Sequence, residues 1–526
     1  MSKRLQLGQS ELSRRDLLRG GAVLGMAVAG SSFLAACSSA TTSSPKAKPR
    51  LGGTFRVGVS GGGSADTLDP LNPISNADFA RIQNLYDPLA VVGADGTPEL
   101  VLAEEITSNS DGSVWTIRIR KGVQFHNGRA LTSKDVAFTL RRILDPKAGG
   151  AAAAGLSLIN AAEIKELDAH TLSVPCRSPF ATLKESLSIA GYSNIVPVGF
   201  DPKRPVGTGP FELVSFTPGR QSVFKKNVSY WRQGRPYLDK VVITDYADET
   251  SQVNALLANQ VDAVNLLSSD SLAQIKSANL GSVISNGGGW NPFTMRVDSA
   301  PLSDVRVRQA LRLSVDRPQM LSLVYGGHGT IGNDVFGIWS ADYDHQLPQR
   351  ERDTEQARSL LRSAGQSDLQ LELVTSPIAQ GATKAAQVFA QQLSGSGVRA
   401  KIRQVSVTDF FGSNYLQWPL AQDYWYYNYY LPQVSLATLR TSPFNETHFN
   451  DAKYGALYLQ AVATVDDQKR AELAGAMQRI DYDQGGYIIP CFPGVIDGYA
   501  TNVHGFVPSK SGLSLNGYQF TDIFLS

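Results

Sequence analysis

Cysteine and histidine are scarce in this sequence, with three Cys and six His among 526 residues. The histidines are scattered, and none pairs with another His, a Cys or a carboxylate at the spacing of a zinc site. No nucleophile elbow, phosphate loop or dinucleotide fingerprint is present. The stretch at 61–64 (GGGS) comes nearest to a phosphate loop, but it lacks the lysine and no helical pattern follows it. We therefore expect no metal, no cofactor and no enzymatic activity.

The sequence also has no strong excess of positive or negative charge. The formal net charge is +2, and it falls to about −1 without residues 1–36, because that segment carries five basic and two acidic residues. Nucleic-acid binding requires concentrated positive charge, so we expect no nucleic-acid partner. The roughly 490 residues that remain exceed the size at which a single core stops growing, which predicts two or three domains.

Long apolar segments are limited to one run, at 20–33, which is too short to span a bilayer. A charged segment containing Arg14 and Arg15 precedes the run, and Leu34-Ala35-Ala36-Cys37 ends it. This order indicates a secretory signal with a twin arginine. The last four residues resemble the bacterial lipobox, in which the cysteine is lipidated. An ordinary signal peptide followed by a chance cysteine is the alternative.

These features predict an exported protein, anchored to the outer face of the cytoplasmic membrane by a lipid on Cys37. Residues 1–36 would be a twin-arginine lipoprotein signal peptide, and residues 37–50 a flexible tether. The two other cysteines, Cys176 and Cys491, could form a disulfide or remain two buried thiols, and the sequence leaves both alternatives open.

Short strands and amphipathic helices alternate along the remainder of the chain. Trp115, Ile117 and Ile119 alternate with polar residues, as in a strand with one buried face. Thr132 and Asp135 have the spacing of a capping box, which predicts a helix that ends near 144. A further helix is predicted to begin near 303 or 304, and residues 357, 360, 361 and 364 share one face of another. Strand-like runs at 369–374 and 398–405 flank a helical stripe at 386–393. This alternation predicts an α/β fold.

Six motifs in a fixed order give the sequence a specific resemblance. They are 115–128 (WTIRIRKGVQFHNG), 208–211 (TGPF), 227–231 (NVSYW), 260–263 (QVDA), 300–311 (APLSDVRVRQAL) and 485–490 (GGYIIP). Together they resemble the extracellular solute-binding proteins of family 5, the peptide- and nickel-type binding components of ABC importers. The resemblance covers nearly the whole chain after the signal segment.

The resemblance implies a two-lobed periplasmic-binding-protein-like fold, of the large type with an extra inserted domain. We expect the main domain of lobe 1 at 51–69, 165–275 and 490–526, the inserted smaller domain at 70–164, and lobe 2 at 276–489. Two chain crossings, near residues 275 and 490, would form the hinge on which the lobes close over a solute.

The ligand site implied by the resemblance lies in lobe 2, where family members commonly carry a Trp-x-x-Asp-Tyr motif. The motif aspartate would pair with a ligand α-amine, but asparagine stands at that position here, which brings no charge. Two alternatives follow: Asp423 takes over the pairing, or the ligand has no free amine there. The candidate binding residues are Asp423, Tyr424, Trp425, Tyr426, Tyr427 and Asn428.

The aromatic run that contains these residues predicts a ligand wall. Because side chains alternate along a strand, one of two sets should face the cleft. The sets are Tyr424, Tyr426 and Tyr430, or Trp425, Tyr427 and Tyr429. A strand buried on both faces is the alternative.

The resemblance implies a monomeric receptor that captures an oligopeptide or a related organic solute and delivers it to ABC permease subunits with their cytoplasmic ATPases. A sugar, an opine-like conjugate or a nickel chelate is the alternative solute. An exported hydrolase and a signalling lipoprotein on the same scaffold are the other function classes considered.

Overall fold

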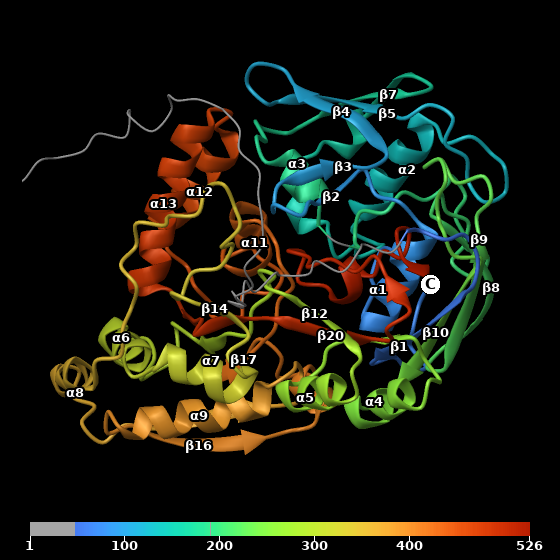
Figure 1. The fold of residues 1–526 in the computed structure, drawn as a ribbon. Coiled ribbons are helices and arrows are strands. Elements are labelled where there is room, and N and C mark those ends of the chain that lie inside the picture. The colour runs from blue at the N-terminus through green and yellow to red at the C-terminus, as the bar shows by residue number, and fades with distance from the viewer. Residues whose placement is uncertain (1–47, 190) are drawn as a thin grey trace, which may run out of the picture. The chain divides into compact units, whose positions relative to one another are not determined.

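The computed structural model describes residues 48–189 and 191–526, and the expected signal peptide and Cys37 lie outside these residues. A seven-stranded mixed sheet contains strands from both ends of the chain (Figure 1). Its strands, in spatial order, are β12 (Gly281–Ser285), β20 (Val495–Tyr499), β11 (Ala263–Val264), β1 (Thr54–Ser60), β10 (Lys240–Tyr246), β9 (Gln221–Lys226) and β8 (Phe211–Thr217). β1 pairs in parallel with β10 and β11, whereas β20 runs antiparallel to β11 and β12.

Helices bury both faces of this sheet. Phe55, Val57 and Val59 alternate along β1 and share a core with α1 (Asn76–Leu85) on one face. On the other face, α4 (Glu249–Leu257) and α5 (Ser269–Ser277) share a core with Val264. The chain after β20 adds β21 (Val503–His504), α14 (Ser514–Gly517) and β22 (Phe524–Leu525) to the first of these cores.

A separate four-stranded sheet forms the smaller domain. It consists of β4 (Ala103–Ser108), β5 (Val114–Ile119), β7 (Thr171–Pro175) and β6 (Lys165–Asp168), with β2 (Ala90–Val92), β3 (Pro98–Leu100), α2 (Ser133–Ile143) and α3 (Leu183–Leu187) around it. The predicted alternation in β5 is confirmed, since Trp115, Ile117 and Ile119 are buried. The predicted capping box at the start of α2 is also confirmed.

The expected end of the inserted domain at residue 164 is wrong. β7 pairs with β5 along five residues, and the core of the small sheet continues to Ile195. The hydrogen-bond ladder therefore carries the smaller domain to Pro175, because a strand belongs to the sheet with which it pairs, and the shared core carries it about thirty residues past the predicted boundary.

The remaining elements form a second group, which we call the second lobe; the seven- and four-stranded sheets form the first lobe. One sheet contains β17 (Leu420–Gln422), β13 (Phe293–Met295) and β18 (Tyr487–Ile488), and a pair of strands joins β14 (Gly329–Ile331) to β19 (Cys491–Pro493). The helices are α6 (Val305–Leu313), α7 (Arg317–Tyr325), α8 (Thr354–Ser363), α9 (Ala382–Ser394), α10 (Val407–Phe410), α11 (Tyr430–Ala437), α12 (Ala452–Ala463) and α13 (Asp467–Gln484).

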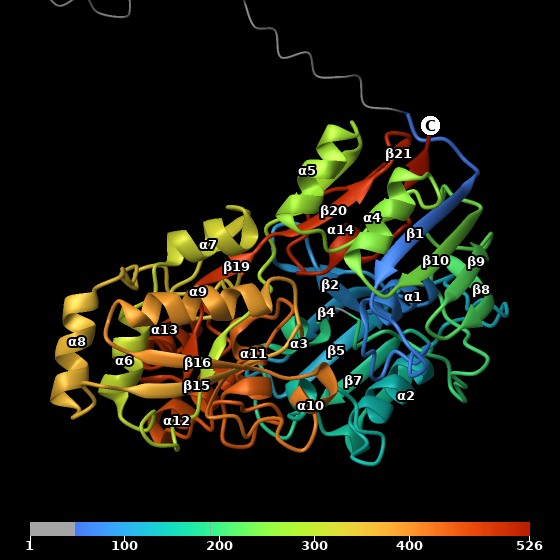
Figure 2. The same ribbon diagram turned by 90° about the horizontal axis from the view of Figure 1, so that it is seen from below.

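The predicted β-α-β unit in the second lobe is confirmed. β15 (Gln370–Thr375) and β16 (Arg399–Gln404) pair in parallel, and α9 connects them and packs on both strands (Figure 2). The predicted helices near 304 and 357 are α6, with Asp304 as its N-cap, and α8.

The chain crosses between the lobes at two places that differ slightly from the prediction. β12 lies beyond the expected crossing at 275, yet it pairs with β20 in the large sheet. β19 lies beyond the expected crossing at 490, yet it pairs with β14 of the second lobe. The crossings are therefore 286–292 and Gly494, because strand pairing fixes which lobe holds each segment.

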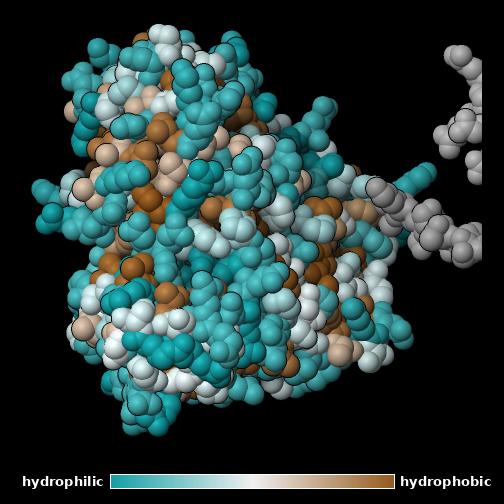
Figure 3. Space-filling model, turned by 90° about the vertical axis from the view of Figure 1, so that its left-hand side faces the viewer, coloured by the Kyte–Doolittle hydropathy of each residue, from teal (hydrophilic) through white to brown (hydrophobic). Residues whose placement is uncertain are grey.

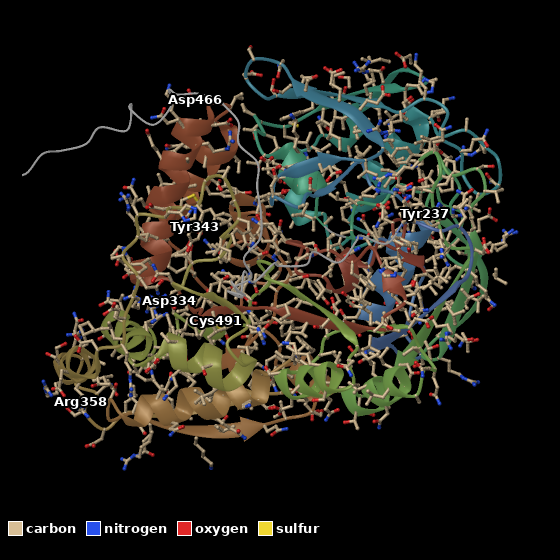
Figure 4. All side chains as sticks on the ribbon, in the orientation of Figure 1. Tyr237, Asp334, Tyr343, Arg358, Asp466 and Cys491 are labelled. Carbon is tan, nitrogen blue, oxygen red and sulfur yellow. The ribbon has the colours of Figure 1, made fainter. Side chains whose placement is uncertain are left out.

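Both remaining cysteines are free thiols, which decides the alternative that the sequence left open. Cys491 is buried on β19 near the middle of the second lobe (Figure 4). Cys176 is half-buried in the smaller domain. Among the described residues, no helix is long and apolar enough to cross a membrane. The face drawn in Figure 3 is mostly hydrophilic, with apolar residues in small scattered groups.

Candidate ligand-binding site

A cavity of about 380 Å³ lies where the two chain crossings meet the lobes. The first lobe contributes Gly61 and Gly62, which follow β1, together with Ser75 and Asn76 at the start of α1. In α/β folds, ligands commonly bind beyond the carboxyl ends of parallel strands and beside the helix starts that lie there. From the crossings come 289–291 and 493–495, and from the second lobe come 378–380, Val407 and 424–426.

Backbone pairing to the first crossing holds the aromatic run in place. After β17, the amide and carbonyl of Trp425 bond to the carbonyl and amide of Trp290, each at 2.9 Å. The two indole rings stack with centroids 6.0 Å apart. The Trp425 indole N–H also donates to Glu446 at 3.0 Å. These contacts fix Trp425 at the cavity wall.

Tyr426 joins the second lobe to the first across the cavity. Its hydroxyl donates to the side-chain oxygen of Asn76 at 3.3 Å, and its ring packs edge-on against Phe79 of α1, with centroids 5.2 Å apart. The same Asn76 oxygen accepts from the Tyr518 hydroxyl at 3.2 Å. The lobes therefore make direct contact beside the cavity.

Three of the six candidate residues line this cavity, and the other three do not. Tyr424, Trp425 and Tyr426 form one wall. Tyr427 is buried, and Asn428 is buried with its oxygen accepting from the Tyr429 amide at 3.0 Å. The expected alternation is wrong, because 423–429 is not a strand: consecutive residues face the cavity, and α11 begins at Tyr430.

Asp423, the sixth candidate, lies behind the wall rather than in it. Its carboxylate accepts from the Tyr415 hydroxyl at 3.1 Å and from the Tyr424 amide at 2.8 Å. Burial raises the pKa of Asp423 to about 6. Burial and the nearby Asp423 charge raise the pKa of Glu446 well above its usual range, and Glu446 accepts from the Tyr487 hydroxyl. This acidic pair supports the wall through Trp425 and does not contact the cavity.

The cavity wall is uncharged. None of the described residues that line it has a charged side chain. Its polar groups are the side chains of Ser75, Asn76, Asn291, Gln380 and Tyr424, and its large flat surfaces are Trp290, Trp425 and the two tyrosines. Neutral donors and acceptors around aromatic faces suit a solute that is neutral where it is enclosed.

Sequence reasoning missed the first-lobe half of this wall. In the sequence, Gly61 and Gly62 show only a weak match to a phosphate loop, and Asn76 and Gln380 carry no recognisable signal. Asn76 follows Ser75, whose side chain caps α1 by accepting from the Asp78 amide. That capping pattern would have placed a helix start here, but not its position beside the aromatic run. Among the described residues, no three His, Cys, Asp or Glu side chains are placed to hold a metal ion.

A cavity lined by two lobes that the chain joins through short crossings is the architecture of the two-lobed solute-binding proteins. The sequence profile of the bacterial extracellular solute-binding proteins, family 5 Middle, matches residues 97–446, which is more than half of the chain. The chain therefore belongs to family 5 of the bacterial extracellular solute-binding proteins.

Comparisons with individual proteins agree with this family. The glutathione-binding protein GsiB of Escherichia coli O6:K15:H31 (strain 536 / UPEC) is 24% identical over 473 residues, covering 86% of this chain and 91% of the relative. The binding protein AgaA from A. tumefaciens R10, solved with agropinic acid, superposes with a TM-score of 0.78 at 23% identity, covering 90% of this chain and 99% of the other. DppA from Helicobacter pylori, solved with the peptide STSA, gives a TM-score of 0.78 at 21% identity, covering 90% and 98%. These two structures show the same α/β fold.

Proposed function

We propose that the protein is the extracytoplasmic receptor of an ABC importer, which captures an oligopeptide or a related organic solute between its lobes and delivers it to the permease. The observation that carries this proposal is the cavity built from both lobes and both crossings. Closure of the lobes about 286–292 and Gly494 would enclose the solute. Peptide-binding relatives support a peptide as the ligand.

The uncharged wall limits the classes of ligand that this cavity suits. A peptide bound here would place backbone amides and uncharged side chains against the aromatic faces, and its free amine would lie elsewhere or be blocked. The same wall favours a second candidate, a sugar, because tyrosine and tryptophan faces with neutral donors also suit a sugar ring. N-acetylated and free forms of one peptide, compared with a simple sugar, distinguish these ligands by calorimetry.

The test begins with native mass spectrometry of the protein purified from its own host, which identifies a co-purified solute. Calorimetry with that solute should show that Trp425→Ala weakens binding by about 1–3 kcal/mol, because a large flat contact is lost. Tyr343→Ala is the matched control, since Tyr343 is a half-buried aromatic residue of the same lobe outside the cavity (Figure 4). Equal affinities for Trp425→Ala and wild type would remove this cavity from the function. Mass spectrometry after incubation also separates binding from hydrolysis.

The anchoring belongs to the same proposal. Export by the twin-arginine signal at 1–36, lipidation of Cys37 and a tether at 37–50 would hold a monomeric receptor near its permease. Cys37→Ala should leave unprocessed precursor or release the protein into the medium. Normal processing and membrane retention of Cys37→Ala would contradict the lipid anchor.

A further inference from the structure

A second cavity, of about 600 Å³, lies between the smaller domain and the second lobe. One wall comes from the smaller domain, including Trp115 of β5 and Glu185 of α3. The opposite wall comes from the second lobe, including Trp339, Asp342 and Tyr429. The two cavities have no lining residue in common, so they are separate sites.

The second cavity is acidic where the first is uncharged. Glu185 and Asp342 reach it from opposite walls, and neither carboxylate forms an ion pair or a hydrogen bond to another residue within the part of the chain that the structure describes. Burial, and secondarily the charge of Glu185, raises the pKa of Asp342 to about 6. Burial also raises the pKa of Glu185. Neither carboxylate is bonded to a cation among the described residues; the charge of Arg470 lowers the pKa of both, and that of Lys184 lowers the pKa of Glu185, but burial outweighs these effects.

The two cations of the described lining, Arg470 and Lys184, act on these carboxylates only through space and form no bond to either. Arg470 bonds to Asp467 at 2.5 Å and to the carbonyls of Thr464 and Val465 at 3.1 and 3.3 Å. Lys184 immediately precedes Glu185 on α3, and side chains at adjacent helix positions do not face each other. Because Asp467 and Arg470 pair with each other, the charged lining residues without a bonded partner among the described residues are Glu185, Asp342 and Lys184.

Polar groups without partners also point to a ligand. Tyr429 is 5% exposed and lines the cavity, and its hydroxyl has no hydrogen-bond partner among the described residues. The indole N–H of Trp339 likewise has none, while the Lys510 ammonium lies 3.8 Å from the centre of the Trp339 ring. A buried polar group without a partner is costly, and a ligand atom can satisfy it.

We propose that this second cavity binds an organic ammonium ion that has an apolar body and an acceptor oxygen near its nitrogen. Glu185, Asp342 and the Tyr429 hydroxyl accept hydrogen bonds from the ammonium group. The Trp339 indole N–H donates to the oxygen. The apolar body packs against Trp115, Leu431 and Val465, which complete the lining. This site goes beyond the proposed function and does not depend on what the first cavity holds.

L-Phenylalaninamide is a suitable probe, because it carries an ammonium group, a carbonyl oxygen and an aromatic body. Calorimetry on the full-length protein at pH 8 should show binding, and N-acetyl-L-phenylalaninamide should bind at least tenfold more weakly. Glu185→Gln and Asp342→Asn should each weaken the probe about tenfold or more, and Tyr429→Phe about two- to fivefold. These replacements preserve shape, and their unfolding transitions verify that they fold.

Two controls make the test specific to this cavity. Asp467→Asn removes a lining carboxylate that is already paired with Arg470, and it should change probe affinity by less than twofold. Trp425→Ala, in the first cavity, should leave the probe unaffected. The proposal is overturned if the probe does not bind, or if the acetylated probe binds equally well. It is also overturned if Glu185→Gln and Asp342→Asn keep wild-type affinity, or if Trp425→Ala loses probe binding. Tight Ca²⁺ or Mg²⁺ binding that depends on the same two carboxylates would overturn it as well.

Discussion

Asn428 shows how a motif position can change its role. The family motif places an aspartate here for a ligand amine, yet the Asn428 side chain is buried and its oxygen accepts from the Tyr429 amide. It therefore shapes the backbone just before α11 instead of lining the cavity. An amine-binding role cannot be transferred to this chain by position alone.

Replacement of Asn428 by aspartate tests this difference. Asn428→Asp can keep the bond to the Tyr429 amide, but above its pKa it buries a charge that has no cationic partner among the described residues. We expect the free energy of unfolding to fall by about 1–3 kcal/mol at pH 8, with a smaller loss near pH 4.5, where the carboxyl is protonated. Urea unfolding at both pH values measures this.

Asn428→Ala is the control, since it removes the hydrogen bond without adding charge and should give a loss that does not vary with pH. Tighter binding of a free-amine peptide by Asn428→Asp would contradict the structural role and place position 428 in the site.

At the scale of single residues, the sequence indicated which segment lines the candidate cavity better than how that segment is arranged. The aromatic run was identified, and Tyr424, Trp425 and Tyr426 do line the cavity. The sequence position of Asp423 predicts a place in the site, but its burial behind Trp425 depends on Tyr415, eight residues earlier, and on Glu446 in a later loop. Contacts between distant segments cannot be derived from local pattern.

Elements with a local signal were predicted well. The capping box of α2 and the parallel unit of β15, α9 and β16 depend on residues close in sequence, and both are present. The aromatic run does not form a strand although its residues favour strands, because within the described residues it makes one isolated bridge, to Trp290, and no ladder. The domain boundaries failed for a related reason, since β7 and β12 belong to sheets whose other strands are distant in sequence.

The first crossing depends on a glycine for its close approach to the aromatic run. A Cβ atom on Gly288 would lie 2.2 Å from the ring of Tyr427, which is itself buried. We expect Gly288→Ala to lower the free energy of unfolding by about 1–3 kcal/mol, because the ring must move within a packed interior. Denaturant unfolding measures the loss.

A glycine with free space is the matched control for this substitution. No heavy atom lies within 4 Å of a Cβ built on Gly63, so Gly63→Ala should change stability by less than about 0.5 kcal/mol. Removing the Tyr427 ring should also relieve the clash. In a Tyr427→Ala background, Gly288→Ala should therefore lower the free energy of unfolding by less than it does in the wild type. Equal costs in both backgrounds would show that the contact with Tyr427 is not the cause.

For the whole molecule, buried charge is concentrated in a few places. In the first lobe, Arg81 is fully buried and pairs with Asp66 at 2.8 Å and with Asp245 at 2.5 Å. In the second lobe, Asp334 is buried and pairs with Arg317 at 2.7 Å and with Arg350 at 2.9 Å. The near-neutral net charge of the sequence gave no indication of these clusters, because composition does not reveal which carboxyl groups fold into the interior.

The buried carboxyl groups give the stability of the molecule an unusual dependence on pH. Burial raises the pKa of one group of aspartates, to about 6 for Asp245, Asp342 and Asp423 and to about 7 for Asp481 and Asp497. Between about pH 4 and 7 the folded state keeps protons that the unfolded chain releases, so the free energy of unfolding falls as pH rises. Groups with the opposite shift act at lower pH: hydrogen bonding to Arg296 lowers the pKa of Asp298 to about 2, and its contribution is lost only as pH falls below about 4.

We therefore expect the ligand-free protein to be most stable between about pH 4 and 5 and to lose stability toward pH 8. The buried His126 opposes this trend, since burial lowers its pKa and its contribution grows as pH rises toward 6.5, but it is one group against these five aspartates and also Glu185 and Glu446. Urea midpoints across pH 4–8 measure the profile. Asp481→Asn should flatten it, because an amide oxygen can still accept from the Tyr430 and Tyr454 hydroxyls, which lie 2.6 and 3.0 Å away, and no longer ionises. A maximum near pH 7–8, or an unchanged slope in Asp481→Asn, would show that these carboxyl groups ionise freely in the folded protein.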